Sequence, residues 1–142
     1  MGPANERRAQ LFVELGERAT VRDLVQVLVV PLVESVLSRT PSYWARFLLQ
    51  ALSDPTTGLA ALASVDDRVL AAATTRLERH LTHLSPEART LRVQSVFGYA
   101  AVVLAAYETG LLPPSLTGPA LTAEIVDACC ALVGAPNDQE QR

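Results

Sequence analysis

Hydrophobic residues recur along this chain at the three- and four-residue spacing of an α-helix, and turn residues separate the runs. No stretch alternates between apolar and polar positions as a half-buried strand would, and no Asn-Gly or Asp-Gly hairpin signal occurs. The pattern predicts an all-α chain of about six helices, at 4–17, 21–38, 41–53, 59–84, 86–109 and about 120–133. We expect one domain, with residues 1–4 and 135–142 as tails.

Three of the predicted helix starts carry capping residues. Thr20 is followed three positions later by Asp23, an aspartate version of the capping box. Ser85 is followed by Pro86, which suits the first position of a helix because proline has no N–H to leave unpaired. These residues predict starts near 21 and 86, and Thr40 before proline predicts a start at 41 in the same way.

The predicted helix at 21–38 is apolar around most of its circumference, which is typical of a buried helix. Pro31 lies inside it and removes one backbone donor, so that one carbonyl of the preceding turn loses its partner. We expect the freed carbonyl to be available to a polar group of a ligand.

Composition and the position of the cysteines indicate the size of the core and the cellular compartment of the protein. Hydrophobic residues make up 49% of the 142, enough for the core of one domain. Cys129 and Cys130 are adjacent, and adjacent Cα atoms lie about 3.8 Å apart, too close for an unstrained disulfide. We expect two free, buried thiols, with a redox or metal role as the alternative. The polar N-terminus and the short, interrupted apolar runs predict a cytoplasmic protein without membrane contact.

Charged residues exclude several classes of chemistry. All 12 basic residues are arginine, so Schiff-base lysines and a P-loop lysine are excluded. The net charge of −3 gives no reason to expect a nucleic-acid backbone as a direct partner. No nucleophile–histidine–acid set and no glycine-rich phosphate loop is recognisable, and we expect no cofactor.

Histidine spacing offers one metal-site candidate. His80 and His83 lie three positions apart on the predicted helix at 59–84, a spacing that can chelate a metal. Arg76 and Arg79 lie close by and oppose a divalent cation. We therefore expect no metal, and both histidines on a solvated face or at the rim of a pocket.

Small residues on the last two predicted helices indicate a subunit interface. They allow close approach of another helix, and two such helices packed against a symmetry mate would form a four-helix interface. The alternative is that both faces are buried within one subunit. The expected interface residues are Gly98, Ala101, Ala105, Ile125, Cys129 and Leu132.

Four segments resemble the C-terminal domain of TetR-family transcriptional regulators. The stretch YWARFLLQALSDP at 43–55 is similar to the aromatic–arginine–leucine helix of that family, which ends in Asp-Pro. The stretch HLSPEARTLR at 83–92, leading to VFG at 96–98, looks like the turn and long helix that follow. Residues 5–15 look like the end of the connecting helix, and 21–36 like the helix after it.

The resemblance implies a helical effector-binding and dimerisation domain of a bacterial regulator, acting as a homodimer on a small apolar or aromatic ligand. In the family this domain follows a DNA-reading helix-turn-helix module, which does not precede residue 5 here. We therefore expect no nucleic-acid contact by this chain itself. Two alternatives stay open: a stand-alone enzyme or carrier acting on an apolar natural product, and a protein-interaction domain without a ligand.

A bundle of this kind would hold its ligand in a largely apolar pocket. If the small-residue stripe faces a partner subunit, the tyrosines of the helix at 86–109 face inward. The alternative for each aromatic residue is ordinary core packing. Glu108, near the end of that helix, is either a ligand contact or, the reading we favour, part of an exposed last turn. The expected ligand-binding residues are Trp44, Arg46, Phe47, Leu48, Gln94, Phe97, Tyr99 and Tyr107.

Overall fold

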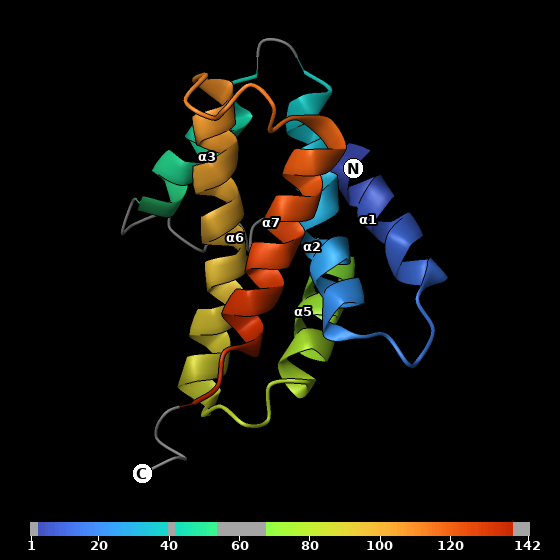
Figure 1. The fold of residues 1–142 in the computed structure, drawn as a ribbon. Coiled ribbons are helices and arrows are strands. Elements are labelled where there is room, and N and C mark those ends of the chain that lie inside the picture. Colours follow the sequence, from blue (N-terminus) through green and yellow to red (C-terminus); the bar gives the residue numbers. More distant parts are fainter. Residues whose placement is uncertain (1–2, 40–41, 54–67, 138–142) are drawn as a thin grey trace.

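The computed structural model describes residues 3–39, 42–53 and 68–137, and this part of the chain contains six helices and no strand. The predicted fold class, all-α, is confirmed. The helices are α1 (Pro3–Glu14), α2 (Val21–Leu37), α3 (Trp44–Ser53), α5 (Arg68–Arg79), α6 (Pro86–Glu108) and α7 (Gly118–Gly134) (Figure 1).

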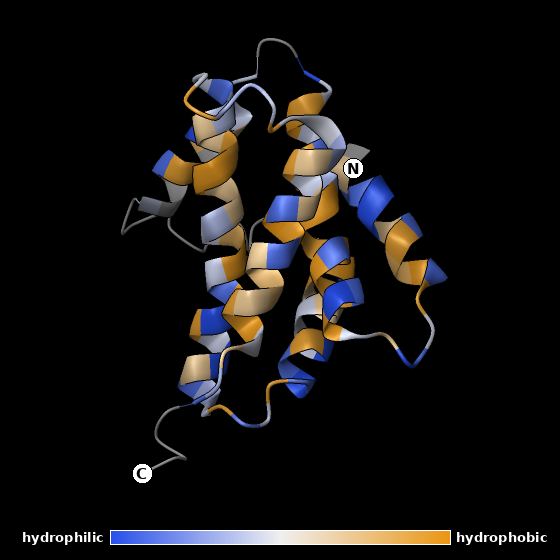
Figure 2. Cartoon of the chain, in the orientation of Figure 1, coloured by the Kyte–Doolittle hydropathy of each residue, from blue (hydrophilic) through white to orange (hydrophobic). Residues whose placement is uncertain are grey.

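α2 is the central helix. It packs against α1, α5, α6 and α7, and its side chains from Leu24 to Val36 supply a large share of the buried core. α6 and α7 lie side by side, and α3 packs against α6 (Figure 1). Both α6 and α7 carry hydrophobic positions along most of their length, while hydrophilic positions gather on α1 and toward the start of α6 (Figure 2). The order of elements is the one that the periodicity predicts.

The predicted caps at two helix starts are confirmed. The Thr20 hydroxyl accepts from the Asp23 amide at 3.2 Å, and the Asp23 carboxylate accepts from the Thr20 amide at 2.9 Å, which completes the capping box of α2. The Ser85 hydroxyl accepts from the Ala88 amide at 3.2 Å, with Pro86 at the first position of α6. Each cap satisfies backbone donors that the helix itself leaves unpaired.

Ends of the helices α1, α3 and α5 differ from prediction. α1 begins at Pro3, inside the expected tail, and ends at Glu14. α3 begins at Trp44, and the residues that suggested a start at 41 lie outside the described part of the chain, as does the portion of the expected helix at 59–67. α5 ends at Arg79. Between it and α6 the chain forms turns in which a backbone amide donates to the carbonyl three residues earlier. Leu81 and Leu84 are buried in these turns. Because their spacing fits a helix, the sequence predicts a helix that continues to residue 84.

α2 continues as a helix through Pro31, and the carbonyl that Pro31 leaves free is occupied. That carbonyl belongs to Val27, and the Arg8 guanidinium donates to it from Nε at 3.2 Å. The same side chain approaches the Leu28 carbonyl at 3.5 Å and Asn5 Oδ1 at 3.0 Å, and Arg8 is only 3% exposed. The expectation of a carbonyl open to a ligand is therefore wrong, because an arginine from α1 takes the place of the missing donor.

α6 is long and apolar enough, by length and composition, to cross a membrane, and among the described helices it alone meets this criterion. The apolar run of this helix is interrupted at Gly98, and for that reason the sequence predicts no membrane-spanning helix here. A core helix of a soluble protein meets the same criterion, and α6 packs here against α2, α3, α5 and α7.

Candidate functional site

The outward face of α6 and α7 forms a shallow, open groove of about 600 Å³. Its surface is largely apolar, and Leu91 at its edge is 64% exposed. Arg92 is the cation in this groove, and it donates from Nη1 to the carbonyls of Leu132 at 2.8 Å and Ala135 at 3.0 Å. These bonds satisfy carbonyls at the end of α7, where a cation also complements the helix dipole. The lining residues are Leu91, Arg92, Ser95, Tyr99, Ala128, Ala131, Leu132 and Ala135.

The expected interface residues divide between the core and this groove. Ala101, Ala105, Ile125 and Cys129 are buried within the subunit and contribute to its own packing. Leu132 lines the groove, and the Cβ position of Gly98 has no neighbour within 4 Å. Four of the six residues therefore follow the alternative of burial inside one subunit. Any partner meeting this face would contact the groove residues instead.

The residues of α6 divide differently from the expected inward and outward sets. Ala101 and Ala105, expected to face a partner, are buried within the subunit, while Tyr99, expected to face inward, is partly buried and lines the outer groove beside α7. Tyr107 packs against the core. Apolar residues lie all around α6, so the phase of its hydrophobic pattern does not identify the buried side. The pattern predicts a buried helix but leaves its rotation open.

The expected ligand-binding residues do not share one environment. Trp44, Phe97 and Tyr107 are partly buried and pack against the core, which is also what ordinary core packing predicts. Phe47 is 70% exposed on the outer side of α3, and Gln94 is half-buried. The side chain of Leu48 lies outside the described part of the structure. Tyr99 belongs to the outer groove, where burial, with a smaller effect of Glu124, raises its pKa.

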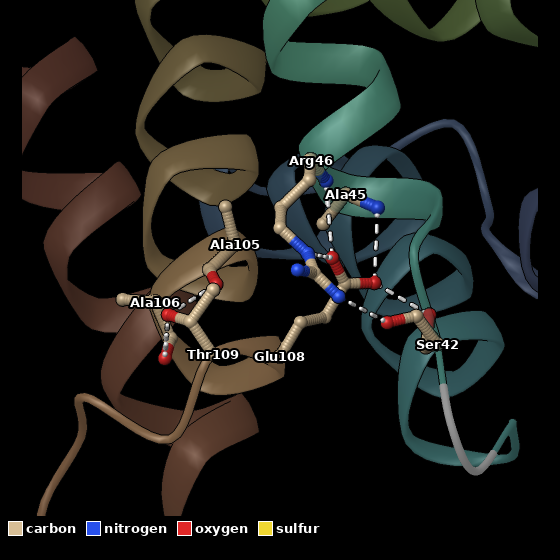
Figure 3. A network of polar contacts seen from close by, with 7 residues as sticks. All are labelled: Ser42, Ala45, Arg46, Ala105, Ala106, Glu108 and Thr109. Carbon is tan, nitrogen blue, oxygen red and sulfur yellow. Dashed lines mark hydrogen bonds and ion pairs between the residues drawn. The ribbon is translucent and has the colours of Figure 1, made fainter.

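Arg46 and Glu108 belong to a buried polar network that joins α3 to the end of α6 (Figure 3). The Glu108 carboxylate accepts from the Ser42 hydroxyl at 2.5 Å and from the backbone amides of Ala45 at 3.1 Å and Arg46 at 3.0 Å. The Arg46 Nε lies 3.5 Å from Glu108 Oε1, the oxygen that also accepts from the Arg46 amide. The Glu108 side chain is 0% exposed. The expectation that Glu108 lies in an exposed last turn is therefore wrong.

The charge state of Glu108 follows from these contacts. Burial alone raises the pKa of a carboxyl group, but here the hydrogen bonds from Ser42, Ala45 and Arg46, together with the Arg46 charge, lower it further than burial raises it. The net pKa of Glu108 therefore lies below the ordinary value of a glutamate side chain, and the carboxylate is ionised at neutral pH. An ionised carboxylate that accepts from a hydroxyl and two backbone amides at the start of α3 acts as a helix cap supplied by another helix.

The Arg46 side chain is 40% exposed and contacts Ser42, Tyr43 and Glu108. Its Nη2 donates to the Ser42 carbonyl at 3.3 Å, and its guanidinium lies 4.6 Å from the centre of the Tyr43 ring. Its Nε is buried without a hydrogen bond and meets Glu108 as an ion pair only. Among the signals in the sequence, Ser42 two residues before Trp44 could have indicated this start of α3, while Thr40 before proline drew attention to an earlier one.

The histidines do not form a chelating pair on a helix. α5 ends at Arg79, so His80 is exposed in the following turn, and His83 approaches the Ala135 carbonyl through Nε2 at 3.4 Å. Within the described ranges, no group of three or more histidine, cysteine or carboxylate side chains could hold a metal ion.

Comparison with known proteins finds no matching family model, no matching curated protein and no matching solved structure. The resemblance to TetR-family regulators therefore rests on the segments at 5–15, 21–36, 43–55 and 83–98.

Proposed function

We propose that this chain is the small-molecule-sensing and dimerisation domain of a TetR-like transcriptional regulator, with an apolar or aromatic ligand. In this role the chain acts as a cytoplasmic homodimer. DNA would be contacted by a separate N-terminal module. The ligand would change the relative populations of two arrangements of the subunits, because it binds one arrangement more tightly than the other.

The observation that carries the proposal is the groove between α6 and α7. Large apolar residues are exposed there next to small ones: Leu91 and Leu132 flank Ala128 and Ala131. Small side chains let a second helix pair approach closely, and the exposed leucines would lose their contact with water. α6 has 23 residues and is therefore about 35 Å long. α7 has 17 residues and is therefore about 26 Å long. The α6–α7 pairs of two subunits would together form a four-helix interface.

One experiment tests both halves of the proposal. Sedimentation velocity measures association, and native mass spectrometry of the same sample, purified from its natural source, detects a retained small molecule. We expect a dimer that the double substitution Leu91→Glu and Leu132→Glu converts to a monomer. Buried carboxylates across such an interface are costly to desolvate.

The matched control is Val13→Glu, because Val13 is an apolar residue on α1 that is 82% exposed. It introduces the same side chain away from the groove and is expected to leave the dimer intact. A wild-type chain that sediments as a monomer, or a dimer unaffected by both groove substitutions, contradicts the dimerisation half. A dimer whose mass never exceeds that of two polypeptides, even with candidate aromatic compounds added, contradicts the sensing half.

A further inference from the structure

α3 is attached to the rest of the described structure mainly through one helix. Among the described helices it packs extensively only against α6, whereas α2 packs extensively against four (Figure 1). Phe47 on its outer side is 70% exposed, and Tyr43, directly before the helix, is 64% exposed. The position of α3 is therefore decided at its seam with α6.

The polar contacts of that seam are concentrated at one point. Glu108 receives its hydrogen bonds from Ser42, Ala45 and Arg46, which lie within five consecutive positions at the start of α3 (Figure 3). The apolar anchors described on α3 are modest: Ala45 is fully buried, while Trp44 and Leu49 are only partly buried. Hydrogen bonds to an ionised acceptor are stronger than neutral ones. A single carboxylate thus accepts three hydrogen bonds from the described residues at the start of α3.

We propose that α3 is a detachable arm, which leaves α6 as a unit while the other helices stay folded, and that the Glu108 carboxylate is the latch that sets how often it does so. Without this carboxylate the amides of Ala45 and Arg46 lose their acceptor and the Arg46 guanidinium loses its counter-charge. Free energies of local opening differ between parts of one protein, and a peripheral helix whose described contacts lie mainly with one neighbour is expected at the low end. This inference concerns the fold and does not depend on the proposed function.

The chain contains a natural reporter of this motion. Trp44 is its only tryptophan and lies in the first turn of α3, partly packed against the core. Quenching of its fluorescence by acrylamide therefore measures the exposure of the arm, and hydrogen exchange of residues 44–53 measures its opening. Peptides from α2 and α7 report on the rest of the molecule.

The test compares the wild type with Glu108→Gln, which keeps the size of the side chain and removes its charge. The matched control is Glu34→Gln, because Glu34 also pairs with an arginine, Arg7, at 3.2 Å, but in an exposed pair between α1 and α2. Glu108→Gln should accelerate exchange in 44–53 roughly ten- to hundredfold and increase the quenching of Trp44. Exchange in α2 and α7 should stay at the wild-type rate, and Glu34→Gln should leave α3 unchanged.

Other outcomes overturn the proposal. Unchanged exchange in α3 would show that Glu108 is not the latch. A parallel increase in α2 and α7, or a Glu108→Gln chain that does not fold, would show that α3 is no separable unit. Ser42→Ala provides a milder second test, since it removes one bond to Glu108 and keeps the charge. It should accelerate exchange several-fold in 44–53 alone, and either no change there or a uniform change along the chain contradicts the proposal.

Discussion

At the scale of single residues, two adjacent thiols have different surroundings. Cys129 is fully buried, and its Sγ lies 3.8 Å from the Val96 carbonyl. Burial, and secondarily the neighbouring Cys130, raises the pKa of Cys129 to about 12. Cys130 is half-buried; burial raises its pKa as well, but Arg22 acts in the opposite direction. The two thiols are free, as expected from their spacing, and differ in access to solvent.

We predict that iodoacetamide at pH 8 alkylates Cys130 well before Cys129. The thiolate is the reactive form, and a pKa of about 12 in place of the ordinary 9.0 reduces its population roughly a thousandfold at this pH. Peptide mass spectrometry of Cys130→Ser and Cys129→Ala chains gives each rate separately, with the urea-unfolded chains as the reference. Alkylation of Cys129 in the folded protein at its unfolded rate would contradict the burial seen here.

At the scale of elements, the residues that encode helix starts locally are those that sequence alone predicts well. Thr20 and Asp23 specify the start of α2 because the cap is made by residues three positions apart. The end of α5 is different, since Leu81 and Leu84 are buried by tertiary packing of a turn. The cap of α3 comes from Glu108, more than sixty positions away, and Ser42 beside the helix start takes part only by donating to that carboxylate.

Arg8 also satisfies a backbone group of a helix far away in the sequence, because it donates to the carbonyl that Pro31 leaves without a helix bond. Arg8→Met removes the donor to the Val27 carbonyl and should lower the free energy of unfolding by about 1–3 kcal/mol. Pro31→Ala restores a backbone donor to the same carbonyl, so it should recover part of this loss in the Arg8→Met chain. Urea denaturation of the wild type, both single variants and the double variant gives the coupling. Strictly additive effects would show that the arginine does not replace the missing helix bond.

At the scale of the whole molecule, the rotation of α6 decides which residues build the core and which remain for a partner. The apolar composition of α6 makes both rotations plausible from sequence, and only packing against α2, α3, α5 and α7 selects one. As a consequence Ala101 and Ala105 belong to the core, and Leu91, Tyr99 and Leu132 line the outer groove. The sequence thus predicts the helix and its burial, while the faces follow from the assembled bundle.

This rotation predicts a clear separation between stability and association. Ala101→Leu inserts three heavy atoms where the side chain is 1% exposed, and overpacking of this kind lowers the free energy of unfolding by about 1–3 kcal/mol. The loss should be the same at low and high protein concentration, because the strain lies within one subunit. Leu132→Ala should have a smaller effect on the isolated subunit, since Leu132 is already 36% exposed.

Urea melts of both variants over a hundredfold range of protein concentration, with sedimentation velocity at each end, test this assignment. If instead Ala101→Leu leaves the unfolding free energy of the monomer intact and abolishes association, Ala101 faces a partner and α6 is rotated in solution. If Leu132→Ala lowers stability only where the wild type associates, the groove between α6 and α7 is the surface at which two copies meet. The two substitutions therefore distinguish the two possible rotations of one helix by measurements on the whole molecule.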